Sequence, residues 1–267
     1  MNWMLFPTLI LTFLLFGMGS WLWGCSRSLA ARAGVLLGAA AFALLGLLVP
    51  AYYLRWFDTS CWYYQFRSYP MTELTGAAIG FSAGVFIAST GKFKMFTRPM
   101  VLALLAFWIA LPYLKPIVLP LYSVGPLQDR WRDGVCLQST GSTCGPSCAA
   151  TLLQSFGIHA TEAEIARKCF TYSDSTESWY LARELREHGL VAEYVFMPQS
   201  SGELPVPSIA GVKIGELGHF VSLIAETNSI YITGDPIVGR REYPKSEIWK
   251  KFQFTGLFLK VEQPPKQ

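Results

Sequence analysis

Apolar residues dominate four long stretches among the first 121 positions of the chain, and short polar segments separate them. About 20 apolar residues in a helix are enough to cross the hydrocarbon core of a bilayer. Charge is almost absent within the stretches, and the first ends in an aromatic pair, Trp21 and Trp23, which is typical of a membrane interface. We therefore predict an all-α transmembrane region of four helices, over about 3–23, 33–54, 74–90 and 100–121.

The pattern of apolar positions changes after residue 121. A linker, 122–134, leads into a second region, 135–262, and the chain ends in a short tail, 263–267. The second region begins with helical periodicity, in predicted helices near 144–156, 161–169 and 175–188. Alternating strand patterns follow, near 191–197, 209–214, 220–225, 230–233 and 254–261, with a short helix at 245–252. Helices followed by antiparallel strands indicate an α+β domain.

Charge is concentrated in the same way. The chain is 52% hydrophobic and only 15% charged, and its net charge is +4. Its first 121 residues hold eight basic and two acidic residues, so the positive charge lies beside the apolar stretches. No basic cluster in the second region resembles a nucleic-acid surface. We expect the lipid membrane as a partner and no nucleic acid.

The basic residues also predict an orientation in the membrane. The connections after the first and third predicted helices carry Arg27, Arg32, Lys92, Lys94 and Arg98. The connection after the second carries only Arg55 and Arg67, and short loops rich in Lys and Arg stay in the cytoplasm. Lys115, Arg130 and Arg132 reduce the difference. We expect a multi-pass protein of the bacterial cytoplasmic membrane, with its C-terminal domain outside the cytoplasm.

One segment of the second region carries reactive chemistry. Cys144 precedes Gly145 and Pro146, and proline is well placed in the first turn of a helix. A thiol at a helix N-terminus feels the positive end of the helix dipole, which favours the thiolate. Gln138 lies six residues before the cysteine, and a side-chain amide there could donate a hydrogen bond to a developing oxyanion. We predict that Cys144 is a nucleophile.

A nucleophilic cysteine needs a base, and the chain contains three histidines. His188 ends a predicted helix, and His159 lies in a turn. His219 opens a buried strand, and Asp235 ends the next strand sixteen residues later, so a hairpin can return the carboxylate to the ring. An aspartate there would hold the imidazole in the productive tautomer. A buried structural histidine and an Asp-Pro turn are the alternatives.

The order Cys144, His219, Asp235 resembles that of papain-like cysteine peptidases, with Gln138 at the upstream oxyanion position. Residues from about 135 to 261 resemble the bacteriocin-processing peptidase family, whose members remove double-glycine leaders. The matching motifs are Gln138, the Cys-Gly-Pro step at 144–146 with Cys148, the His-aromatic-Val segment 219–221, Asp-Pro at 235–236 and the closing strand 256–259. The resemblance implies a papain-like peptidase domain over 135–262, with a peptide or protein substrate.

The sequence departs from this family at three points. Thr143 stands where the family often has an acid. No Walker-type glycine loop occurs, so we expect no nucleotide partner. The domain follows four predicted spans, whereas well-known relatives carry it at the N-terminus of an export transporter. The four predicted site residues are intact.

The remaining cysteines have simpler interpretations. Cys148 lies one helical turn beyond Cys144 and is expected to pack inside. Cys136 and Cys169 could form a disulfide if the domain faces outward, but the sequence does not pair them. No Cys-x-x-Cys and no His-x3-His pair occurs, so we expect neither a metal nor another cofactor.

These observations predict a membrane-anchored cysteine peptidase that uses Cys144, His219 and Asp235, with Gln138 in the oxyanion hole. A catalytically silent domain that binds peptides beside the membrane is one alternative. A thiol amidase or acyltransferase of related fold is another. A membrane assembly protein in which the four spans do the main work is the third.

Overall fold

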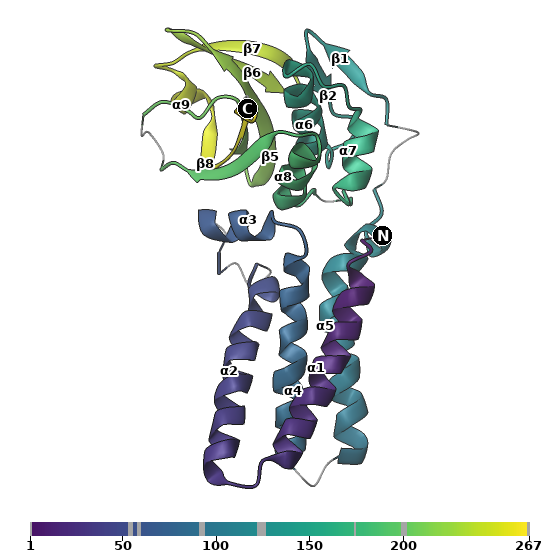
Figure 1. Ribbon diagram of the computed structural model, residues 1–267. Coiled ribbons are helices and arrows are strands. Elements are labelled where there is room, and N and C mark those ends of the chain that lie inside the picture. The colour runs from purple at the N-terminus through teal and green to yellow at the C-terminus, as the bar shows by residue number, and fades with distance from the viewer. Residues whose placement is uncertain are drawn as a thin grey trace. The chain divides into compact units, whose positions relative to one another are not determined.

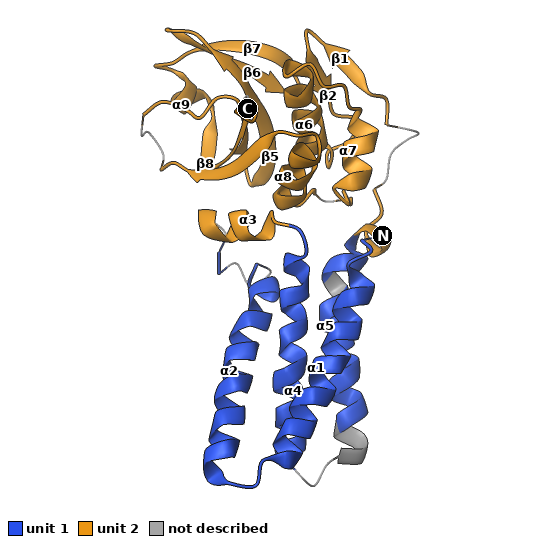
Figure 2. Ribbon diagram, in the orientation of Figure 1, with its two compact units in different colours: residues 1–58, 70–115 blue, residues 59–69, 116–267 orange. Residues whose placement is uncertain are grey.

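The computed structural model describes residues 2–52, 56–57, 60–90, 94–121, 127–173, 175–198 and 202–265. The chain divides into two compact units, which Figure 2 distinguishes by colour. Unit 1 is Met1–Asp58 and Pro70–Lys115, and unit 2 is Thr59–Tyr69 and Pro116–Gln267. Parts of three predicted segments lie outside the described residues, namely 53–54 of the second helix, 122–126 of the linker and 266–267 of the tail.

The described part of unit 1 contains helices and no strand. Its elements are α1 (Leu5–Cys25), α2 (Leu29–Ala51), the 3-10 helix η1 (Thr72–Ala78), α4 (Ile79–Ser89) and α5 (Lys94–Val118). Among the described residues, α1, α2 and the segment Thr72–Ser89 are long and apolar enough to cross a membrane. A fourth candidate exists if Arg98–Ala110 and Pro112–Val118, which are bent by 68°, form one broken span. Helices that are long and apolar enough to cross a membrane are therefore present among the described residues, and their number is three or four.

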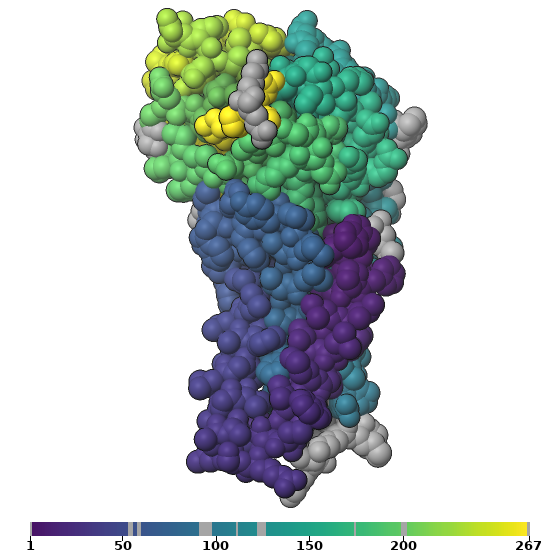
Figure 3. Space-filling model, viewed as in Figure 1, coloured from purple at the N-terminus to yellow at the C-terminus, as the bar shows by residue number. Residues whose placement is uncertain are grey.

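Close backbone contact joins α1 to α4. A Cβ atom added to Gly84 would lie 2.1 Å from the backbone oxygen of Phe16, and one added to Gly80 would lie 2.3 Å from that of Thr12. Small residues four positions apart permit this approach, a common arrangement between membrane helices. Large apolar side chains lie on the outer surface of the helices. Along α1 (purple in Figure 3), the exposed residues include Ile10, Leu14 and Trp21.

Unit 2 contains a six-stranded antiparallel sheet in the order β3-β8-β4-β5-β6-β7. The strands are β3 (Val191–Phe196), β4 (Ser208–Ile214), β5 (Leu217–Glu226), β6 (Ile230–Asp235), β7 (Gly239–Pro244) and β8 (Gln253–Glu262). A small hairpin, β1 (Arg130–Arg132) with β2 (Val135–Leu137), precedes it. The sequence did not predict β7, an edge strand whose central residues, Arg240, Arg241 and Glu242, are exposed and charged.

Three helices, α6 (Cys144–Ser155), α7 (Glu162–Lys168) and α8 (Ser178–Glu187), gather beside the sheet in Figure 1. Their core packs Leu152, Leu153 and Leu181 against Leu259 and Val261. A second core includes Val221, Leu223 and Phe258 and extends to α9 (Ile248–Lys251). Thr161 and Glu164 form a capping box at the start of α7. An α+β domain with an antiparallel sheet is confirmed.

A further helix of unit 2 comes from the connection between α2 and η1. This helix, α3 (Cys61–Arg67), lies at the outer edge of β3, where the Gln65 Oε1 accepts a hydrogen bond from the Tyr194 N–H at 2.9 Å. Arg186 of α8 donates to the Ser68 carbonyl oxygen at 2.7 Å. The side chains of Tyr63 and Arg67 are buried. Residues 59–69 of this connection therefore belong to the folded core of unit 2. The sequence did not predict this.

Candidate active site

Cys144 is the first residue of α6, as the sequence predicted, and only 8% of it is exposed. A tight turn precedes it. The Thr143 N–H donates to the Thr140 carbonyl oxygen at 3.3 Å, and the Thr140 N–H donates to the Thr143 Oγ1 at 3.1 Å. Thr143, which replaces the acid common in the resembling family, is thus a fully buried part of the turn that delivers the cysteine.

His219 and Asp235 lie on the neighbouring strands β5 and β6. The register pairs Ser222 with Gly234, which brings the start of β5 beside the end of β6. The His219 Nε2 is 3.3 Å from the Asp235 Oδ1, and that oxygen also accepts the Ile237 N–H at 2.8 Å. Because Nε2 faces Asp235, Nδ1 is the ring nitrogen that remains for a second partner. The two residues therefore meet as the hairpin argument predicted.

The electrostatics couple three of the predicted side chains. Burial lowers the pKa of His219, but hydrogen bonds with the side chains of Asp235 and Cys144 outweigh it and raise the pKa to about 9. Burial raises the pKa of Asp235, but hydrogen bonds from His219 and from the Ile237 N–H bring it below its ordinary value. The site thus favours an imidazolium beside an aspartate anion.

Packing between α6 and β5 brings the thiol and the imidazole together. A Cβ atom added to Gly145 would lie 2.9 Å from the Leu181 Cδ1 and 3.4 Å from the Phe220 Cδ2. Glycine directly after Cys144 thus lets the start of α6 approach the residue directly after His219. One turn further along α6, the Ser222 Oγ donates to the Cys148 carbonyl oxygen at 3.2 Å.

The backbone of Gln138 is hydrogen-bonded beside the end of β6, where Asp235 lies. Its N–H donates to the carbonyl oxygen of Pro236, the residue after Asp235, at 3.0 Å. Its side-chain Oε1 is buried, and it has no hydrogen-bond partner among the described residues. The unpartnered atom is an acceptor, and the donor that an oxyanion needs is the NH2 group of the same amide.

The other cysteines and histidines have structural surroundings. Cys148 is fully buried in the core of α6, as expected. Cys136 and Cys169 are buried free thiols, and burial raises the pKa of Cys136 to about 12. His188 ends α8, where its Nε2 is 3.1 Å from the Glu184 Oε1. Within the described part of the chain, no cluster of three or more His, Cys, Asp and Glu residues could hold a metal.

A residue that the sequence did not single out supports the loop before Cys144. Glu162, the first residue of α7, is fully buried, and its carboxylate binds Ser139, the residue after Gln138. A glutamate at the first position of a short helix gives no sign in sequence that it reaches a loop 23 residues earlier.

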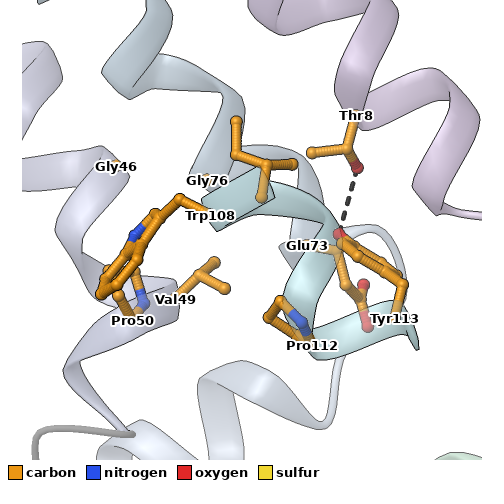
Figure 4. Close-up of a pocket in the computed structure, with 10 residues that line it drawn as sticks. Thr8, Gly46, Val49, Pro50, Glu73, Gly76, Trp108, Pro112 and Tyr113 are labelled. Carbon is orange, nitrogen blue, oxygen red and sulfur yellow. Dashed lines mark hydrogen bonds between the residues drawn. The ribbon is translucent and has the colours of Figure 1, made fainter. Parts of the chain in front are cut away.

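Unit 1 contains a cavity of about 230 Å³, drawn in Figure 4. Its lining is mostly apolar and includes Trp108 and Pro112, with Glu73 as the one acid. The Thr8 Oγ1 and the Tyr113 hydroxyl, which also line it, are 3.1 Å apart. None of the predicted site residues lines this cavity.

A thiol at a helix start and an imidazole–carboxylate pair on an antiparallel sheet define a cysteine-peptidase-like domain. Residues 132–266 match the model of the Peptidase C39 family, and the chain belongs to that family. The predicted family is therefore confirmed.

Relatives and solved structures each match about half of the chain. An uncharacterized protein of Methanothermobacter marburgensis is 32% identical over 126 residues, which is 47% of this chain and 86% of that protein. One from Methanothermobacter thermautotrophicus is 32% identical over 130 residues, 49% of this chain and 89% of that protein. The peptidase domain of Streptococcus ComA, a bi-functional ABC transporter involved in a quorum sensing pathway, is 20% identical with a TM-score of 0.42, covering 49% of this chain and 98% of that domain. A double glycine motif protease from an AMS/PCAT transporter, in complex with the leader peptide, is 18% identical with a TM-score of 0.39, covering 54% and 96%.

Proposed function

We propose that the chain is a membrane-anchored cysteine peptidase whose nucleophile is Cys144. The observation that carries the proposal is the His219 ring, whose Nε2 is 3.3 Å from the Asp235 Oδ1 and whose pKa is raised by the side chains of both Asp235 and Cys144. A buried structural histidine, the alternative left open by the sequence, has no need of a thiol at a helix start beside it. The family supports the same chemistry.

In the proposed reaction, the Cys144 sulfur attacks the carbonyl carbon of a peptide bond. The Cys144 backbone N–H and the Gln138 amide stabilise the oxyanion of the tetrahedral intermediate. The imidazolium form of His219, favoured by its pKa of about 9, gives a proton to the leaving amine as the C–N bond breaks. Water then attacks the thioester with His219 as the base, which releases the acid product and restores the thiol. Asp235 orients the ring throughout.

The substrate that we propose is a peptide with small residues at the cleaved bond, such as a double-glycine leader. Cys144 is only 8% exposed, so access to its sulfur is narrow and favours a residue without a bulky side chain. Membership of the family supports the same substrate class.

We further propose four membrane spans over 1–121, a linker over 122–134 and a peptidase domain over 135–262. The connection between α2 and η1 contributes α3 to unit 2, so this connection and the peptidase domain lie on one side of the membrane. An even number of crossings must separate them, which requires α5 to cross as well as α4. The five basic residues of the other two connections then favour the cytoplasm for those connections and the outside for the peptidase domain.

Purified full-length chain in detergent provides the test. We expect it to hydrolyse a fluorogenic peptide that ends in Gly-Gly-amidomethylcoumarin, and Cys144→Ala should abolish turnover without lowering the melting temperature. Iodoacetamide should label Cys144 in the wild type and far more slowly in His219→Gln. Turnover that survives Cys144→Ala would overturn the proposal. Labelling without hydrolysis of any peptide would instead support a silent peptide-binding domain, or an amidase or acyltransferase.

The orientation needs a separate measurement. Spheroplasts exposed to an added protease should lose the C-terminal domain while a cytoplasmic marker protein stays intact. Protection of the domain until the membrane is lysed would contradict the outward orientation.

A further inference from the structure

The loop that carries Gln138 is held by a buried carboxylate outside the predicted catalytic set. Glu162 is fully buried, and each of its carboxylate oxygens accepts one hydrogen bond from Ser139. Its Oε1 accepts the backbone N–H at 2.7 Å, and its Oε2 accepts the hydroxyl Oγ at 2.5 Å. Hydrogen bonds to an ionised acceptor are short and strong, so this pair fixes Ser139 firmly.

Neighbouring bonds complete the support. The Glu162 N–H donates to the Asp129 Oδ1 at 3.1 Å, which anchors the start of α7. The Ser139 Oγ accepts the Gln128 N–H at 2.9 Å while its own proton goes to Glu162. The Gln138 backbone N–H is tied on its other side to the Pro236 carbonyl. The backbone around Gln138 is thus fixed on both sides.

The two donors that Ser139 presents match a carboxylate. The backbone N–H and the hydroxyl each donate to one carboxylate oxygen, while the hydroxyl oxygen already accepts the Gln128 N–H. A glutamine of the same shape would keep one acceptor for the Ser139 N–H but present its NH2 group to the hydroxyl, which would then turn its proton away and lose its bond to a charged acceptor. Burial of a carboxylate is costly unless it is hydrogen-bonded, so this arrangement is demanding to build.

We propose that Glu162 is the positioning residue for Gln138, because its hydrogen bonds to Ser139 orient the Gln138 amide toward the oxyanion. This inference rests on the proposed peptidase function and adds to it a residue that touches neither substrate nor thiol. A small displacement of a catalytic group can lower a rate by about a hundredfold.

The chain offers a matched control on the same helix. Glu164 lies two residues beyond Glu162, but it belongs to the exposed capping box with Thr161 and does not reach the loop. Glutamine is also accepted at that position of a capping box. Glu164→Gln therefore makes the same chemical change on α7 without touching the Ser139 loop.

The experiment measures two reactions of the full-length chain in detergent. Hydrolysis of the Gly-Gly-amidomethylcoumarin peptide forms an oxyanion, whereas alkylation of Cys144 by iodoacetamide forms none. We expect Glu162→Gln to lower kcat by about 10- to 100-fold, with KM and the alkylation rate within about twofold of the wild type. Glu164→Gln should behave as the wild type. Ser139→Ala, which removes one of the two donors, should lower kcat in the same sense.

A double-mutant cycle separates positioning from a structural role. Adding Glu162→Gln to Gln138→Ala should cost no further activity, because the amide to be positioned is already absent. Three results would each overturn the inference: activity losses of the two substitutions that multiply in the double mutant, equal declines of alkylation and hydrolysis in Glu162→Gln, or an unchanged kcat of Glu162→Gln. A wild type without Cys144-dependent hydrolysis would overturn the proposed function and this inference with it, whereas normal wild-type turnover with an unaffected Glu162→Gln would overturn the inference alone.

Discussion

Gln138 lies on a loop and Cys144 at a helix start, whereas His219 and Asp235 lie on neighbouring strands of a sheet. The helix side is held by side chains, with Thr143 closing the turn and Glu162 binding Ser139. The sheet side is held by backbone pairing between β5 and β6. Substitutions of reactive groups on the sheet side should therefore leave the geometry intact, while the helix side should be sensitive to residues that never meet a substrate.

The largest effect is expected on the sheet side. His219→Gln keeps a donor for Asp235 but cannot exchange a proton with the thiol or the leaving amine. We expect hydrolysis to fall by at least ~10⁴-fold and alkylation of Cys144 to fall with it. Because the ladder between β5 and β6 uses only backbone groups, far-UV circular dichroism should not change. A variant with rapid alkylation would show that His219 does not activate the thiol.

A smaller effect is expected on the helix side. Gln138→Ala removes one proposed oxyanion donor, which typically lowers kcat by about 10²–10³-fold. Alkylation of Cys144 should persist, in contrast to His219→Gln. Steady-state kinetics together with iodoacetamide labelling will check this. Equal hydrolysis by Gln138→Ala and the wild type would remove Gln138 from the oxyanion hole.

The pH dependence of stability tests the sheet side further. The pKa of His219 is raised from 6.5 to about 9, so its contribution to the unfolding free energy is complete below pH 6.5 and is lost as the pH rises through 9. Asp235→Asn removes the anion that supports the imidazolium. We expect the melting temperature of the wild type to exceed that of Asp235→Asn below pH 6.5, and the difference to shrink above about pH 9. A difference that grows with pH would contradict the assignment.

The same contrast explains how far the sequence could predict the site. A helix start is predicted by three consecutive residues, Cys144, Gly145 and Pro146, and α6 begins there. His219 and Asp235 could be connected only through the expected length of a hairpin, which the strand register supports. Local signals and one short-range pairing were thus enough to bring His219 and Asp235 together.

Other features depend on contacts that leave no local pattern. The edge strand β7 does not alternate, because three consecutive residues, Arg240, Arg241 and Glu242, are exposed and charged. Helix α3 sits between two apolar stretches and reads as a loop, yet its Gln65 bonds Tyr194, 129 residues away. Glu162 and Ser139 meet across 23 residues in the same way. Each of these pairings is decided by tertiary structure.

The smallest effect is expected at Cys148, on the same helix as the proposed nucleophile. Its side chain is fully buried, and burial raises its pKa well above the ordinary value, so it is not a second nucleophile. Cys148→Ala should cost about 1 kcal/mol of stability through a small cavity, with turnover within about twofold of the wild type. Thermal melts and hydrolysis of the same peptide will check both. Turnover that falls tenfold or more, while iodoacetamide still labels Cys144, would show that the packing of α6 on β5 sets the geometry of the site. The position of the helix side would then depend on the sheet as much as on its own side chains.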